Sequence, residues 1–145
     1  MLKKIKLLLI IFILYNFQSS SFAVEDFYNE GKQKYNEKKL DEAKFLFQRS
    51  IVFDPKDSKS YLYLAKIFNF EKNQKEEEKN ILTTLLLDPI NEEAIYMLME
   101  IDLKKSNYSE VKKSLSIFSE ICKDLCEKDK LIIESLKNLE PNNES

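Results

Sequence analysis

Apolar residues recur at every third or fourth position along most of the chain, with polar residues between them. One such stripe runs through Phe27, Gly31 and Tyr35, and the next begins with Leu40 and Ala43. Because this spacing follows the turn of an α-helix, each stripe predicts one face of an amphipathic helix of roughly 13 residues. The polar stretch 36–39 predicts the turn between the two helices.

A longer period is marked by two Asp-Pro pairs, Asp54-Pro55 and Asp88-Pro89, which lie 34 residues apart. Each pair follows an apolar stretch and precedes a polar turn and a further apolar run. Proline cannot donate a backbone hydrogen bond, so each Asp-Pro predicts the end of a helix. Self-similarity at a fixed period predicts one structural unit that is repeated along the chain.

A period of 34 residues that ends in Asp-Pro resembles the tetratricopeptide repeat. Placing proline at the family's last conserved position gives three registers, 24–57, 58–91 and 92–125. The first register matches the family's large and small positions well. The second departs from the pattern at Gln74 and Glu77, which predicts looser packing at the start of its second helix. The third carries larger residues at small positions and Lys123 in place of proline, so we interpret it as degenerate.

Residues 126–139 carry one more apolar stripe, formed by Leu131, Ile132, Leu136 and Leu139. A single helix pair cannot bury its apolar face alone, and terminal units of repeat proteins are atypical. The expected fold class is therefore all-α: an α-α superhelix, or tetratricopeptide-like solenoid, of about three helix pairs. A capping helix and a polar tail are expected over 126–145. The first pair has no such cap, so its outer face is expected to be exposed or to dock a partner or a second copy.

Residues 1–23 have the three parts of a secretory signal peptide. Three lysines precede the apolar run 7–17, and small residues occupy Ser21 and Ala23. We expect cleavage after Ala23 and export, to a bacterial periplasm or as a secreted protein, with no membrane span afterwards. A retained anchor is the alternative, but the run is shorter than the roughly 20 residues that a spanning helix needs. A lipoprotein is disfavoured because no cysteine lies near the cleavage region.

Composition disfavours several functions. Net charge is −2, and removal of the three leader lysines leaves 20 basic and 25 acidic residues, or −5, which argues against nucleic-acid binding. Histidine is absent, so no Ser-His or Cys-His catalytic pair can form. With one glycine, Gly31, no phosphate-binding glycine loop is present. Glu76–Glu78 point in different directions on a helix and predict a solvated helix start rather than a metal site. We expect no enzyme, cofactor or metal.

Cys122 and Cys126 lie four residues apart and would share a helix face if the helix extends that far. In an exported protein they could form a disulfide. The alternative is a pair of small apolar residues that pack against the capping helix.

In the tetratricopeptide family the concave face is lined by the first helix of each repeat. The resemblance implies that a peptide or protein partner contacts this face, although some of these residues could instead pack between helices. The family's chaperone-binding set is not expected, because Tyr28 and Lys32 occupy the positions where that set begins with lysine and asparagine. The candidate groove residues are Tyr28, Lys32, Tyr35, Leu62, Lys66, Asn69, Phe70, Tyr96, Glu100 and Leu103.

The expected function is thus an exported protein–protein interaction module, a scaffold or adaptor that binds a peptide or protein, for example in cell-envelope assembly. A self-associating structural protein is the alternative. An enzyme subunit is less favoured, because the repeat pattern comes without catalytic chemistry.

Overall fold

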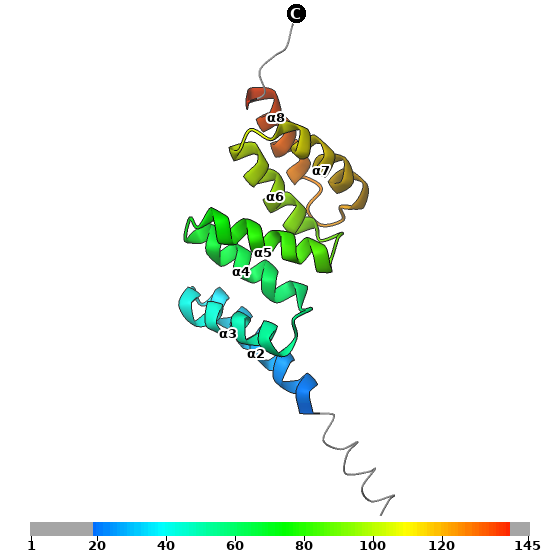
Figure 1. Cartoon of the computed structure of the whole chain (residues 1–145). Coiled ribbons are helices and arrows are strands. Elements are labelled where there is room, and N and C mark those ends of the chain that lie inside the picture. Colours follow the sequence, from blue (N-terminus) through cyan, green and yellow to red (C-terminus); the bar gives the residue numbers. More distant parts are fainter. Residues whose placement is uncertain (1–18, 140–145) are drawn as a thin grey trace, which may run out of the picture. The chain divides into compact units, whose positions relative to one another are not determined.

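The computed structural model describes residues 19–139, with side chains from Asp26 onward, and this part of the chain contains seven helices and no strand. Figure 1 shows them in chain order. The first 18 residues of the predicted signal peptide lie outside the described part, and the predicted cleavage position falls within α2. The helices are α2 (Ser19–Asn36), α3 (Leu40–Phe53), α4 (Ser58–Phe70), α5 (Gln74–Leu87), α6 (Glu92–Lys104), α7 (Tyr108–Ile121) and α8 (Lys128–Leu139).

The 34-residue period is present in the backbone itself. Helices α3, α5 and α7 begin 34 residues apart and also end 34 residues apart, and α4 and α6 do the same. The turn inside each pair has one residue with positive φ, at Lys38, Lys72 and Ser106, again at intervals of 34. Thus the third pair, whose sequence matches the family pattern least, has the same backbone turn as the other two.

Each of these turns is a Schellman motif. At the end of α4, the Lys72 N–H donates to the Asn69 carbonyl and the Asn73 N–H donates to the Phe68 carbonyl. The same two bonds close the turns after α2 and α6. The motif satisfies helix carbonyls that would otherwise have no partner, and it requires a left-handed residue, usually glycine. Here the three left-handed residues are two lysines and a serine, which bear the steric cost of a Cβ in that conformation.

The chain divides into two compact units, residues 1–60 and residues 61–145. In the first, α2 packs on α3, and Gly31 is the point of close approach. A Cβ added to Gly31 would lie 2.9 Å from the Phe47 ring, whose side chain is fully buried. The other buried residues of α3 are Ala43, Leu46 and Ser50. The absence of a side chain at Gly31 therefore allows the Phe47 ring to fill the space between the two helices.

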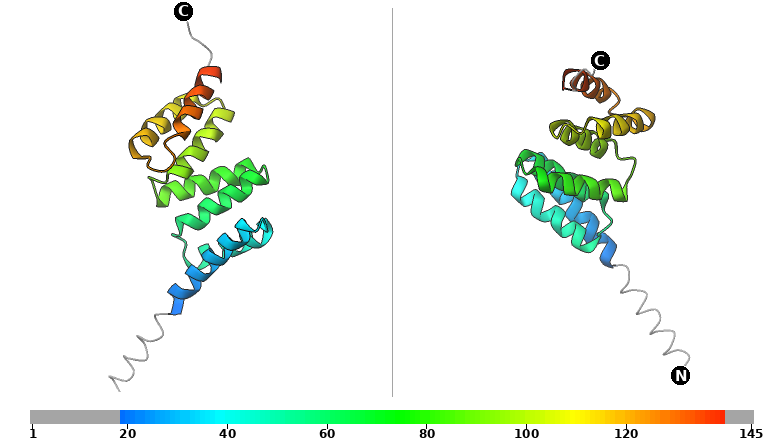
Figure 2. Two further views of the ribbon diagram at one scale, coloured as in Figure 1. Left: turned by 180° about the vertical axis from the view of Figure 1, so that it is seen from behind. Right: turned by 45° about the horizontal axis from the view of Figure 1, so that its top comes forward.

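The second unit has two apolar clusters. The first joins α4, α5 and α6 through buried Leu62, Ala65, Ile81, Ala94, Met97 and Ile101. The second joins α6, α7 and α8 through buried Ile95, Met99, Val111, Phe118, Ile132 and Leu136. In both views of Figure 2, α8 lies beside α6 and α7. Residues from both faces of α6 are therefore buried, and α8 covers one side of this cluster.

The sequence predicted loose packing at the start of α5, but the structure shows specific contacts there. The helix is capped by the Asn73 side chain, which accepts from the Glu76 N–H. Glu77, which replaces the alanine of the family pattern, is 3% exposed, and its carboxylate accepts a 2.7 Å bond from the Asn69 amide of α4. A polar contact thus fills the position that a small residue would otherwise occupy.

The two cysteines lie in the connection between α7 and α8, because α7 ends at Ile121. Cys122 and Cys126 are joined by a disulfide in this loop, rather than on one face of a helix. The Glu92 carboxylate at the start of α6 accepts bonds of 2.8 to 3.1 Å from the N–H groups of three consecutive loop residues, Lys123, Asp124 and Leu125. The bridged loop is therefore attached to α6 as well as to its own two helices.

Within residues 19–139, no helix is both long and apolar enough to cross a membrane.

Candidate partner-binding site

Two of the three candidate residues of the first unit, Tyr28 and Tyr35, have partners inside that unit. The Tyr28 ring lies 6.0 Å from the Phe47 ring, and the Lys59 ammonium lies 5.9 Å from its centroid. The Lys38 ammonium lies at the same distance from the Tyr35 ring. Lys32 is exposed. Both tyrosines are half-buried, so each presents only part of its ring to solvent.

Three candidate residues of the second unit lie outside the cluster that the other four form. Leu62 is 8% exposed and belongs to the core, which leaves almost none of its side chain for a partner. Asn69 holds Glu77 through the bond described above. Phe70 is 73% exposed at the end of α4.

The other four candidates of the second unit are brought together with two residues that were not predicted. We call this set the A-helix strip: Lys66 of α4, Glu93, Tyr96, Glu100 and Leu103 of α6, and Lys128 of α8. The Lys66 ammonium lies 2.6 Å from the Glu93 carboxylate and 4.6 Å from the Tyr63 ring. This ion pair connects α4 to α6 across the strip. Since the Lys66 side chain is only 19% exposed, its charge is held in a partly desolvated position.

Tyr96 is the aromatic side chain of the strip, and contacts with two other strip residues fix it. Its hydroxyl donates a 2.9 Å bond to Glu100, and the Lys128 ammonium lies 5.2 Å from its ring centroid. Burial, followed by the bond to Glu100 and that group's negative charge, raises the pKa of Tyr96 to about 12. The hydroxyl therefore stays protonated, as a donor, at every physiological pH.

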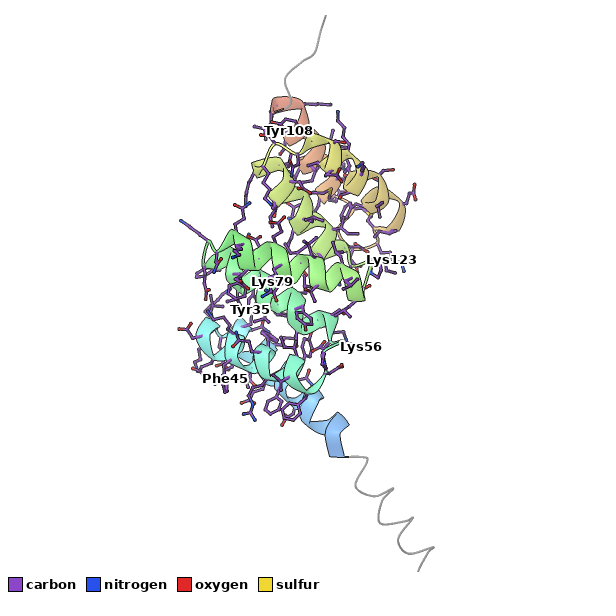
Figure 3. The ribbon with its side chains drawn as sticks, in the orientation of Figure 1. Tyr35, Phe45, Lys56, Lys79, Tyr108 and Lys123 are labelled. Carbon is purple, nitrogen blue, oxygen red and sulfur yellow. A yellow bond between two sulfur atoms is a disulfide. The ribbon has the colours of Figure 1, made fainter. Side chains whose placement is uncertain are left out.

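An open hollow of about 420 Å³ adjoins the strip at the end of α6. Apolar walls come from Leu103 and Leu139, while Lys104 and the hydroxyls of Ser106, Tyr108 and Ser135 provide polar groups. Leu139 is the last described residue of α8. The Tyr108 hydroxyl donates to its backbone carbonyl, so the wall of the hollow that α8 forms is attached to α7. Figure 3 shows Tyr108 beside the end of α8. The hollow has room for one or two side chains of a ligand.

The sequence contained a signal for one of the two missed residues. Glu93 precedes Tyr96 by three positions and so lies on the same helix face as Tyr96 and Glu100. Its position in the first turn of a helix by itself indicates only a favourable contact with the helix dipole. Lys128 gave no comparable signal, because its position over the Tyr96 ring depends on where α8 begins after the bridged loop.

In the described part of the chain, no three or more His, Cys, Asp or Glu side chains are placed to share a metal ion.

Comparisons with known proteins decide the fold. No family model matches the sequence, and no curated protein matches it. The first TPR of Spaghetti (RPAP3), bound to the HSP90 peptide SRMEEVD, matches with a TM-score of 0.72 and 16% identity, over 82% of this chain and 94% of that one. The chain has the tetratricopeptide repeat fold. The all-α, α-α superhelical fold class that the sequence predicted is confirmed.

Two further tetratricopeptide structures agree. The type III secretion chaperone SycD of Yersinia enterocolitica, in complex with a peptide of the translocator YopD, has a TM-score of 0.71 at 19% identity, over 84% of this chain and 95% of that one. The TPR2B domain of yeast Sti1, in a complex with pHsp70, has a TM-score of 0.70 at 17% identity, over 81% and 99%. In tetratricopeptide terms, α4 and α6 are the first helices of their pairs. The A-helix strip lies on these two helices and on the start of α8.

Proposed function

We propose that this tetratricopeptide protein is an exported, non-enzymatic interaction module that holds a peptide or protein segment against the A-helix strip. The observation that carries the proposal is the position of Tyr96: a half-buried ring whose orientation is set by Glu100 and Lys128 at the centre of a strip formed by three helices. Rigid aromatic side chains act as anchors in interfaces because they contribute a large contact area at a small cost in conformational entropy.

The chemistry of the strip suggests what it binds. Lysine and glutamate side chains alternate around Tyr96, so the strip offers hydrogen-bonding groups of both signs rather than one uniform charge. The adjoining hollow is apolar at Leu103 and Leu139. A segment with an apolar anchor residue, flanked by charged residues of both signs, would place the anchor in the hollow and its backbone across Tyr96.

The similar structures support a peptide ligand, since those of RPAP3 and SycD were determined with bound peptides. Their identity to this chain is too low to carry over a particular sequence. The charges here also differ from a site built to hold a single carboxylate, because Lys66 is already neutralised by Glu93.

The test is a selection of peptides from a random library on the full chain, followed by affinity measurements. Tyr96→Ala should weaken the selected peptides at least tenfold, and Tyr96→Phe should weaken them less because the ring remains. Leu86→Ala is the matched control, because Leu86 is 80% exposed on α5, outside the strip. Peptides that bind the Tyr96→Ala variant as tightly as the original chain would contradict the proposal.

The export part of the proposal rests on residues 1–23. Mass spectrometry of the chain recovered outside the cytoplasm should find Val24 at its N-terminus. Replacement of the small residue in Ala23→Arg should leave the leader attached, because a bulky charge at that position is not accepted. Phe27 and Tyr28, whose rings contact α3, remain after cleavage. A chain that stays in the cytoplasm with Met1 in place would contradict export but would leave the binding strip untested by that result.

A further inference from the structure

The loop between α7 and α8 is closed on itself by the disulfide between Cys122 and Cys126, which encloses residues 123–125. A disulfide that closes so short a loop restricts the unfolded chain less than one that closes a long loop. Both cysteines are half-buried, so the bridge is not sealed inside the fold, and Cys122 packs at the edge of the apolar cluster of α6, α7 and α8. The main effect of the bridge is therefore local, because it fixes the shape of this loop.

That shape holds the loop on α6. The three N–H groups that the ring encloses, of residues 123–125, all donate to the Glu92 carboxylate. Figure 3 labels Lys123, the first of these donors. Consecutive backbone N–H groups converge on one anion only in a particular backbone conformation. Without the bridge, the loop would have to lose more conformational entropy to adopt that conformation.

Helix α8 begins on the same loop. The Lys128 N–H donates a 2.8 Å bond to the Leu125 carbonyl, and the Asp129 N–H donates a 3.2 Å bond to the Cys126 carbonyl. The first turn of α8 is thus bonded to residues that the ring encloses or ends on. From this turn the Lys128 side chain places its ammonium 5.2 Å from the centroid of the Tyr96 ring. A continuous series of contacts therefore leads from the disulfide to the aromatic anchor of the A-helix strip.

We propose that the Cys122–Cys126 disulfide is a redox switch for the A-helix strip: the oxidised loop holds Lys128 over Tyr96, and reduction releases it. The inference rests on the proposed function of the strip. The reductant is a dithiol, of the kind that thiol–disulfide oxidoreductases carry. Its thiolate attacks one sulfur of the bridge, and the other sulfur leaves as a thiolate that takes up a proton. The second thiol of the reductant then resolves the mixed disulfide, so that two cysteine thiols and one reductant disulfide result.

The first test compares the affinity of library-selected peptides for the oxidised full chain and for the chain reduced with dithiothreitol. Reduction should weaken binding by about two- to tenfold, because one or two side chains must then become ordered when the peptide binds. The double variant Cys122→Ser, Cys126→Ser should bind like the reduced chain whether or not dithiothreitol is present. Lys128→Ala should bind almost equally in both redox states, because the group that the switch moves is absent.

A second measurement separates the switch from a bridge that only stabilises the fold. The three N–H donors outweigh desolvation and lower the pKa of Glu92. Reduction should therefore raise this pKa toward 4.5 and speed hydrogen exchange over residues 123–129, as measured by nuclear magnetic resonance. Helical content should be kept, because Ile132 and Leu136 still hold α8 in its cluster. A reduced chain that unfolds as a whole, or that keeps the lowered pKa, overturns the proposal.

The two measurements also separate the failure of the switch from the failure of the proposed function. If Tyr96→Ala weakens peptide binding but reduction does not, the strip binds peptides and the switch is overturned. If no peptide depends on Tyr96, the proposed function fails, and the resonances of the Tyr96 ring decide the switch by themselves. These resonances should shift on reduction as Lys128 leaves the ring, and unchanged resonances overturn the proposal.

Discussion

The apolar side chains near the two ends of the described chain differ in how far they are buried. At the C-terminal end, Val111 and Phe118 of α7 are completely buried, and Ile132 and Leu136 of α8 belong to the same cluster. At the N-terminal end, Phe45, Val52 and Phe53 of α3 remain exposed. Within residues 19–139, α8 covers Val111 and Phe118 of α7, although Ile117 stays 51% exposed, whereas no described helix covers the outer side chains of α3. The comparison teaches that an apolar helix face becomes buried only where a further helix packs against it.

The largest expected effect is at the first pair. Phe47→Ala removes a fully buried ring that fills the space beside Gly31 and should lower the free energy of unfolding by about 3–5 kcal/mol. Phe45→Ala, two residues away on the exposed face, should change it by less than about 0.5 kcal/mol. Denaturation with guanidinium chloride measures both. Similar losses for the two variants would mean that Phe45 is not exposed in solution.

The capping helix gives the next largest effect. Ile132→Ala should lower the free energy of unfolding by about 2–4 kcal/mol, because Ile132 is 2% exposed between α6 and α7. Leu131→Ala is the neighbouring control and should cost less than about 1 kcal/mol, because half of its side chain is exposed. Hydrogen exchange should show faster opening of α7 and α8 in the first variant only. Equal losses in both would show that α8 does not cap the array as described.

The bridged loop gives a smaller, pH-dependent effect. Desolvation alone would raise the pKa of Glu92, but the three backbone N–H donors outweigh it and hold the pKa below its ordinary value of 4.5. A lowered carboxyl pKa stabilises the folded chain above pH 4.5, and this contribution disappears as pH falls through the folded-state pKa. Glu92→Gln should therefore cost about 1 kcal/mol at pH 7 and less at pH 3.

Thermal unfolding at the two pH values measures the difference between the original chain and Glu92→Gln. The control is Glu120→Gln, which removes an exposed carboxylate from α7 without touching the bonds between Glu92 and the loop. If the Glu92→Gln variant loses as much stability at pH 3 as at pH 7, the three backbone bonds do not depend on the charge of Glu92.

The smallest effect is a gain. Lys72→Gly places glycine at the left-handed residue of the second Schellman turn and should stabilise the chain by about 0.5–1 kcal/mol, because glycine has no Cβ to strain in that conformation. Lys79→Gly, inside α5, should instead destabilise it by about 1 kcal/mol. Chemical denaturation distinguishes the two signs. A loss in the Lys72→Gly variant would contradict the positive φ at this turn.

Much of the fold could be predicted because its signals are local. The stripe through Phe27, Gly31 and Tyr35 defines a helix face within a few turns. The two Asp-Pro pairs set the period, and all helix pairs follow it. The Asn91 side chain caps α6 by accepting from the Ala94 N–H, as its position before an apolar run predicts. The start of α5 could not be predicted in this way, because Glu77 is buried through a bond to Asn69 of another helix.

The candidate site could be predicted only in part. Leu62 and Tyr96 occupy equivalent positions in successive repeats, so both were candidate groove residues. In the structure Leu62 belongs to the core, whereas Tyr96 is fixed on the strip. The position of a residue in the repeat predicts which side of its helix it lies on only to within the rotation of one residue. A rotation of that size can move a side chain from the core to the surface. Which of two equivalent residues is buried depends on how neighbouring helices approach, and this is not encoded within a single repeat.

The sequence alone determined the helices, their 34-residue period and the fold class, since these follow from backbone geometry and from the order of apolar and polar residues along the chain. Only the tertiary structure decided the position of Lys128 over Tyr96, the attachment of Glu92 to the bridged loop, and which apolar side chains of α3 and α7 are exposed or buried. Such contacts join residues about 30 positions apart or depend on which helices pack together, so no short window of sequence contains them.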